Sequence, residues 1–159
     1  FGLTDVWVVG DASYECNESV SMNADRWLDI HRCDDADAVV AGLRDRGYTL
    51  LAAVPGDDSV ALTDLELPAR TAVMVGNEKD GLCPDLIDAA DVRVNIPMHG
   101  FTQSLNVSAA TAVILQHLSQ AYRAGGPANL IDAETRHRLV SSWCTRDIRT
   151  KTRGHVQLD

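Results

Sequence analysis

Apolar, β-branched runs alternate with segments of helical periodicity along this chain, and this alternation constrains its fold more than any other feature. The strand-like runs lie at residues 5–9, 49–54, 72–75 and 92–96, with a shorter one at 27–30. The helical patterns lie at residues 34–46, 84–90, 104–121 and 132–143. Strands that alternate with helices are typical of parallel βαβ units whose sheet is covered by helices. The sequence therefore predicts an α/β fold with a parallel sheet.

The helical segments differ in character. Residues 34–46 place their acids early and their arginines late, as the helix dipole favours, and Gly47 follows as a stop residue. Apolar residues occupy nearly every face of residues 104–121, which predicts that most of this helix is buried. Beyond Gly125 the chain is polar and basic, which predicts a helix over residues 132–143 and then a frayed tail.

The size and composition are those of one soluble domain. The chain has 159 residues, of which 45% are hydrophobic and 23% charged. It has no apolar run of the roughly 20 residues that cross a bilayer, and we expect a cytoplasmic protein. Because Phe1 stands next to a strand-like run, we expect further residues upstream in the parent protein.

The cysteines give no sign of a metal centre. They are scattered through the sequence without a CxxC pair, at Cys16, Cys33, Cys83 and Cys144. Zinc sites and redox dithiols use closely spaced cysteines. The sequence therefore predicts reduced, structural thiols and no bound metal.

The charge distribution leaves two interpretations open. A net charge of −9 argues by itself against nucleic acid, because Lys and Arg drive phosphate binding. However, six of the 14 basic residues lie close together near the end of the sequence, at Arg136, Arg138, Arg146, Arg149, Lys151 and Arg153. This cluster is either a solvated helix face or a contact surface for a phosphate backbone.

Two loops that follow predicted strands carry candidate site residues. In open α/β sheets, ligands collect at the carboxyl ends of the strands. The loop at residues 76–82 has glycines at both ends, and Glu78 lies where the strand ends. The alternative interpretation of Glu78 is a solvated acid in a surface turn.

The second of these loops, residues 97–106, combines a proline exit, a glycine and two small polar side chains. Ser104 and Asn106 lie just before a helix, so either residue is also a candidate N-cap. The combination predicts a loop that wraps a small ligand and holds polar groups over its reactive end. His99 lies in the same loop, and we assign it no role. The chain has no GxGxxG or GxxxxGK[ST] motif, which argues against a Rossmann-type nucleotide enzyme.

Taken together, residues 75–82 (VGNEKDGL) and residues 96–108 (IPMHGFTQSLNVS) resemble the second and third motifs of SpoU-class (TrmH-type) RNA 2′-O-ribose methyltransferases of the SPOUT superfamily. The ordered pair is very specific, and the resemblance covers roughly residues 1–120. It implies a deep trefoil knot in the C-terminal half of the sheet, which breaks the usual rule against knots. It also implies a homodimer and S-adenosylmethionine as the methyl donor.

The resemblance assigns roles to individual residues. It implies a cofactor site at Ala53, Gly76, Ile96, Met98 and Leu105. It implies a catalytic group of Glu78, Ser104 and Asn106.

The polar tail ending in Trp143 resembles the C-terminal arm of tRNA guanosine-2′-O-methyltransferases. The resemblance therefore implies a methyltransferase domain at residues 1–123 and a basic arm at residues 124–159. We interpret the arm as a tRNA-binding segment, with rRNA as the alternative. Its candidate RNA-binding residues are Arg136, Arg138, Arg146 and Arg149.

One departure from the family lies at the N-terminus. Family members carry a first motif with an Asn and an Arg before the strand that corresponds to residues 6–9, and no such pair precedes Phe1. A 2′-hydroxyl is a poor nucleophile unless its proton is removed or stabilised. We therefore expect this chain to bind the cofactor well but to catalyse methyl transfer poorly. The alternative is a non-catalytic RNA-binding module that retains the knotted fold.

Overall fold

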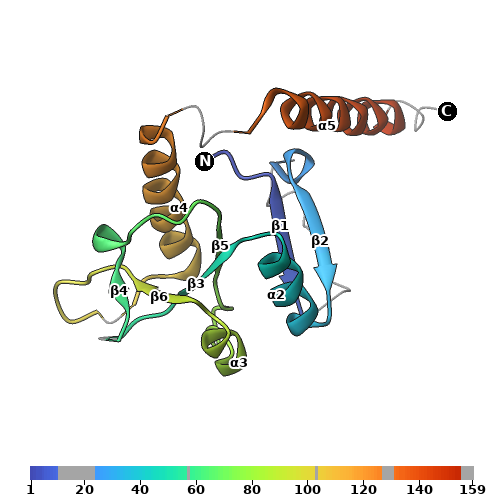
Figure 1. Cartoon of the computed structure of the whole chain (residues 1–159). Coiled ribbons are helices and arrows are strands. Elements are labelled where there is room, and N and C mark those ends of the chain that lie inside the picture. Colours follow the sequence, from blue (N-terminus) through green and yellow to red (C-terminus); the bar gives the residue numbers. More distant parts are fainter. Residues whose placement is uncertain (11–23, 57, 103, 127–130, 155–159) are drawn as a thin grey trace. The chain divides into compact units, whose positions relative to one another are not determined.

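The computed structural model describes residues 1–10, 24–56, 58–102, 104–126 and 131–154, with side chains described to Ile148 (Figure 1). The chain divides into two compact units. The central unit contains Phe1 and Asp35–Asn129, and the terminal unit contains Gly2–Asp34 and Leu130–Asp159. Each unit has a parallel sheet of its own, so the predicted α/β class is confirmed.

The central unit is built on a four-stranded parallel sheet in the order β4-β6-β3-β5. Its strands are β3 (Thr49–Ala53), β4 (Val60–Ala61), β5 (Thr71–Met74) and β6 (Val92–Asn95). Its helices are α2 (Ala36–Asp45), η2 (Leu62–Asp64), α3 (Pro84–Asp88) and α4 (Val107–Ala124). The three long strands lie within a residue of their predicted bounds, whereas the two-residue strand β4 carries too short a pattern to be predicted.

The core of the central unit lies between β3, β6 and α4. Leu51 and Val94 are fully buried and pack against Ile114 of α4. Leu62 and Leu118 complete this cluster. A parallel sheet covered by helices requires such apolar strands.

In the single chain, the prediction that α4 is mostly buried is wrong. Only Ile114 and Leu118, one turn apart, are buried along this helix, while Val113 is 43% exposed and Ala112 is exposed. The physical reason is that the helix packs through one face, and alanines on its other faces make the pattern apolar without requiring burial.

The terminal unit joins segments from far apart in the sequence. Strands β1 (Asp5–Val9) and β2 (Asp29–Cys33) pair in parallel, with Asp5 opposite Asp29. The 3-10 helix η1 (Ala24–Trp27) precedes β2, and α5 (Ala133–Gly154) belongs to the same unit (Figure 1).

Two predictions in the terminal unit require correction. The strand predicted at residues 27–30 begins at Asp29, because the preceding residues form the η1 turn. The tail predicted to fray after Trp143 continues as helix to Gly154, and Arg146 of that continuation bonds to β2. Among the described helices, none combines the length and the apolar character that crossing a membrane requires.

Candidate functional site

The carboxyl edge of the central sheet brings together the predicted cofactor residues of three strands. β3 lies between β5 and β6 and runs parallel to both, so all three strands end at the same edge (Figure 1). Ala53 is the last residue of β3, Gly76 follows β5, and Ile96 follows β6 and packs against the core. The fold therefore places these three predicted positions on one edge.

The loop after β5 is a tight turn that requires glycine. The backbone N–H groups of Asn77 and Gly81 each donate to the other residue's carbonyl, at 3.1 and 3.0 Å. A Cβ atom on Gly76 would overlap the backbone of Gly81 and Leu82. The close approach that the glycine allows is thus an approach of the chain to itself.

The side chain of Asn77 fixes the same turn from inside. Its Oδ1 accepts hydrogen bonds from the N–H groups of Lys79 at 2.9 Å and Asp80 at 2.7 Å. Asparagine commonly stabilises turns in this way. Asn77 was not among the predicted site residues, although the Asp80-Gly81 pair in the same loop is a turn signal.

Glu78 and Asn106, two of the predicted catalytic residues, are in direct contact. The Asn106 amide donates to Glu78 Oε1 at 2.8 Å, and the Val107 N–H lies 3.4 Å from Glu78 Oε2. The carboxylate therefore lies at the N-terminus of α4, where the helix dipole favours a negative charge. This contact ties the loop after β5 to the loop after β6.

Asn106 also caps α4. Its Oδ1 accepts hydrogen bonds from the N–H groups of Ser108 at 2.9 Å and Ala109 at 3.4 Å. The N-cap interpretation of Asn106 is thus confirmed, and the same side chain also contacts Glu78. The predicted catalytic residue Ser104 lies two residues earlier and is exposed.

Apolar side chains remain accessible in the loops of this edge. Val75 is 39% exposed, Met98 37% and Leu105 38%. Exposed apolar groups beside convergent polar groups are typical of a ligand site. Met98 and Leu105 are the two predicted cofactor residues that present such surface.

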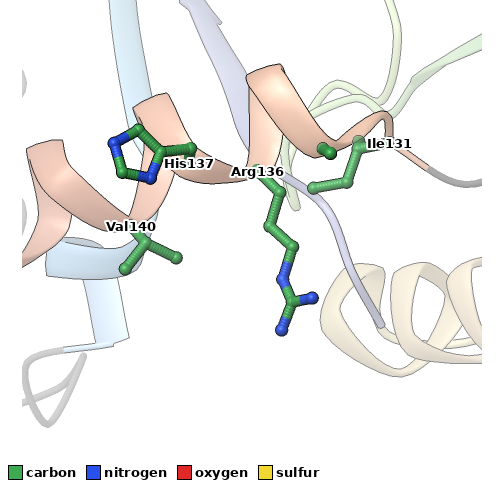
Figure 2. A pocket seen from close by; sticks show the side chains of 5 residues that line it. Ile131, Arg136, His137 and Val140 are labelled. Carbon is green, nitrogen blue, oxygen red and sulfur yellow. The ribbon is translucent and has the colours of Figure 1, made fainter.

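The predicted RNA-binding arginines have different surroundings within α5. Arg136 lines a shallow pocket together with Ile131, Ala133, His137 and Val140, and Figure 2 shows its side chain extending away from the helix. Arg146 donates to the Asp29 carboxylate and to the Leu28 carbonyl oxygen. The side chain of Arg149 lies outside the described residues.

The charge of Arg138 contributes to lowering the pKa of Asp5, an acid that was not among the predicted site residues. Partial burial raises the pKa of Asp5, but bonds from the Thr4 hydroxyl at 2.6 Å and the His31 ring at 3.0 Å lower it. The charges of His31 and Arg138 act in the same direction, and the net effect is a lowered pKa. The His31 ring also stacks on Trp7, with centroids 4.8 Å apart.

Comparison with known proteins shows the family. The model of the SpoU rRNA Methylase family matches residues 1–116 of this chain. This chain belongs to the SpoU family. The resemblance carried by residues 75–82 and 96–108 is thereby confirmed.

Two curated relatives are tRNA (guanosine(18)-2′-O)-methyltransferases. The protein of Borreliella burgdorferi is 32% identical over 123 residues, which cover 77% of this SpoU-family chain and 56% of the relative. The protein of Aquifex aeolicus is 28% identical over 134 residues, covering 83% of this chain and 64% of the relative. The chain therefore spans a little over half to about two thirds of the length of these relatives.

Solved structures agree with the SpoU assignment. The A. aeolicus TrmH/SpoU tRNA modifying enzyme has a TM-score of 0.80 at 26% identity, over 92% of this chain and 77% of that one. The SpoU methyltransferase AviRb from Streptomyces viridochromogenes, in complex with AdoMet, has a TM-score of 0.65 at 22% identity, over 77% and 51% of the two chains. The second likeness concerns the fold alone.

Proposed function

We propose that this chain binds S-adenosylmethionine and takes part in the 2′-O-methylation of a ribose in RNA, with a tRNA guanosine as the substrate. The observation that carries the proposal is the Glu78–Asn106 contact, which joins the two family motifs at the carboxyl edge of the sheet. The relatives that are named tRNA guanosine-2′-O-methyltransferases support the choice of reaction and of substrate. Such an enzyme acts on the tRNA pool, so we propose that the protein is located in the cytoplasm.

The residues at this edge fit the proposed cofactor. Met98 and Leu105 offer exposed apolar surface for the adenine, and the strand ends at Ala53, Gly76 and Ile96 offer backbone groups. When bound, S-adenosylmethionine supplies an electrophilic methyl group. In our proposal these residues hold and orient it.

The polar residues divide into two roles. Both carboxylate oxygens of Glu78 face hydrogen-bond donors, so we assign Glu78 to positioning Asn106 and the start of α4 rather than to proton transfer. Ser104 is exposed beside this pair, and we propose that it lies near the ribose. Correct placement of the two reactants accounts for much of the rate in such transfers.

The chain's larger organisation completes the proposal. Residues 1–123 act as the methyltransferase domain, whose third-motif segment forms the trefoil knot, and residues 124–159 act as the RNA-binding arm. One face of α4 is accessible to solvent in the single chain, and this accessible face supports a homodimer. It forms a shallow hollow of about 350 Å³, lined by Phe1, Val107, Ser108, Thr111, Ala112 and Leu115.

Calorimetric titration with S-adenosylmethionine, or with its demethylated product, tests the cofactor site. We expect saturable binding to the 159-residue chain and its loss in Leu105→Arg, because an arginine would put a charge on the apolar surface. Leu3→Arg, at a leucine of the terminal unit that is 46% exposed against 38% for Leu105, serves as the control and should retain binding. A folded wild-type chain that binds no cofactor would favour the non-catalytic RNA-binding module.

A further inference from the structure

The C-terminal half of α5 is fixed within the terminal unit by two ion pairs. Arg146 pairs with Asp29 at the start of β2, and Asp147 pairs with Arg26 of η1 at 3.5 Å. Arg146 also donates to the Leu28 carbonyl oxygen at 2.7 Å. We call Arg26, Asp29, Arg146 and Asp147 the η1–α5 clamp. The neighbouring residues Arg146 and Asp147 thus carry opposite charges, and each pairs with a residue of the other sign.

The surroundings of the clamp strengthen these pairs. The rings of Trp27 and Trp143 meet edge to face, with centroids 6.1 Å apart. Within the described part of the chain, the buried Trp143 indole N–H has no hydrogen-bond partner, which indicates apolar surroundings. The side chains of Arg146 and Asp29 are only 35% and 27% exposed. Charges in partly dry surroundings interact more strongly than charges in water.

Toward the N-terminus of α5, Arg136 is an exposed cation. Arg136 lines the open pocket with Ile131, His137 and Val140, and its guanidinium extends away from the helix (Figure 2). By contrast, Arg146 already faces a carboxylate. A cation with a protein partner has less to gain from a phosphate, because it must first give up that partner.

We propose that Arg146 and Asp29 are positioning residues, which fix α5 so that Arg136 meets the RNA backbone. This inference rests on the proposed function. It reassigns Arg146, for which the sequence predicted direct RNA contact. We infer the role of Asp29 from its pairing with Arg146 in the terminal unit. No sequence motif marks this residue, so the sequence alone did not predict its role.

Removal of the Asp29 charge distinguishes a positioning role of Arg146 from direct contact with phosphate. The two roles predict changes of RNA affinity in opposite directions. If Arg146 positions α5, Asp29→Asn weakens binding of an unmodified tRNA transcript, although the protein becomes less acidic. We expect a loss of about threefold to tenfold, the range for one ordinary hydrogen bond. If Arg146 instead contacts phosphate, the same change frees it and strengthens binding.

Glu134→Gln is the matched control for the general charge effect. Glu134 is an exposed carboxylate in the first turn of α5, outside the clamp. Its neutralisation should leave RNA affinity unchanged or slightly higher. Arg136→Ala should reduce the slope of log affinity against log salt by about one, as expected for a lost phosphate contact.

A charge swap distinguishes positioning from general destabilisation. We expect Asp29→Arg and Arg146→Asp each to weaken RNA binding and the double variant to recover part of the affinity, with cofactor affinity unchanged throughout. Tryptophan fluorescence reports whether α5 stays docked, because Trp27 and Trp143 are in contact beside the clamp.

Three outcomes would overturn the inference. Tighter RNA binding by Asp29→Asn would assign Arg146 to direct contact. Absence of any recovery in the double variant would remove the pair from the positioning role. Failure of the unsubstituted chain to bind RNA, with the Asp29→Asn fluorescence still altered, would overturn the proposed RNA function and leave the clamp as a structural contact only.

Discussion

Asn106 connects local helix stability to the candidate site through one amide group. Its oxygen accepts hydrogen bonds from the start of α4, and its nitrogen donates to Glu78. Loss of the side chain therefore removes a helix cap and leaves the carboxylate without its shortest partner. Substitutions at this position report on both functions together.

We predict that Asn106→Ala lowers the free energy of unfolding by about 1–2 kcal/mol, the usual cost of a lost N-cap, and also weakens cofactor binding. Asn106→Asp is the informative comparison, because Asp caps helices as well as Asn but repels Glu78. Urea unfolding and calorimetry measure the two effects. Equal cofactor affinity in both variants and the wild type would show that the Glu78–Asn106 contact does not support the site.

Gly76 allows a backbone approach that no other residue type permits. We predict that Gly76→Ala destabilises the chain by more than about 2 kcal/mol and abolishes cofactor binding, because its Cβ would overlap the backbone of Gly81 and Leu82.

The same substitution at Gly42 has the opposite expected sign. Gly42 lies within α2, and a Cβ built there meets nothing within 4 Å. Alanine at a helical position stabilises by up to about 1 kcal/mol relative to glycine. Urea midpoints for Gly76→Ala and Gly42→Ala that shift in the same direction would contradict this account of the turn.

At the scale of the elements, the ionised form of Asp5 stabilises the unit that contains β1 and β2. Its lowered folded-state pKa means that folding favours the carboxylate over the ordinary value of 3.8 in the unfolded chain. The stability that Asp5 contributes is therefore present above pH 3.8 and is lost as the pH falls through the lower folded-state pKa.

We predict that Asp5→Asn lowers the free energy of unfolding at neutral pH by up to about 1 kcal/mol, a value discounted for solvent screening because the pair with His31 is partly exposed. The difference between wild type and variant should shrink at pH values below 3.8. Urea titrations at neutral and strongly acidic pH measure it. A difference that stays constant with pH would assign the effect to packing.

The elements also show how far sequence reasoning reaches. The strands at 49–54, 72–75 and 92–96 could be predicted because buried parallel strands need continuous apolar residues, and the loops after them because ligand sites lie at strand ends. The burial of α4 could not be predicted, since alanine fits both a core and a surface. The partner of Arg146 could not be predicted either, because Asp29 is 117 residues away in the sequence.

At the scale of the whole molecule, the uncovered face of α4 carries the proposed homodimer. We predict that Ala112→Arg, at an exposed position of this face, converts a dimer to a monomer without unfolding it. A buried arginine without a partner opposes association.

Gln120→Arg, an exposed position elsewhere on α4, is the control and should remain dimeric. Sedimentation velocity distinguishes the two states. A wild-type chain that sediments as a monomer at micromolar concentration, or an Ala112→Arg variant that stays dimeric, would place the interface elsewhere or remove it.

The terminal unit is assembled from two segments that lie far apart in the sequence, so the ribosome synthesises them at different times. β1 and β2 are made early, but Arg146, which pairs with Asp29 of β2, follows that residue by 117 residues. At translation rates of about 5–20 residues per second, the two strands wait on the order of ten seconds for α5. In the sequence, nearly all of the central unit falls between these two segments, so it can fold during that interval. The nascent chain therefore holds a pair of uncovered strands while the candidate cofactor edge takes shape, and a stalled or shortened message would leave those strands open to chaperones and proteases.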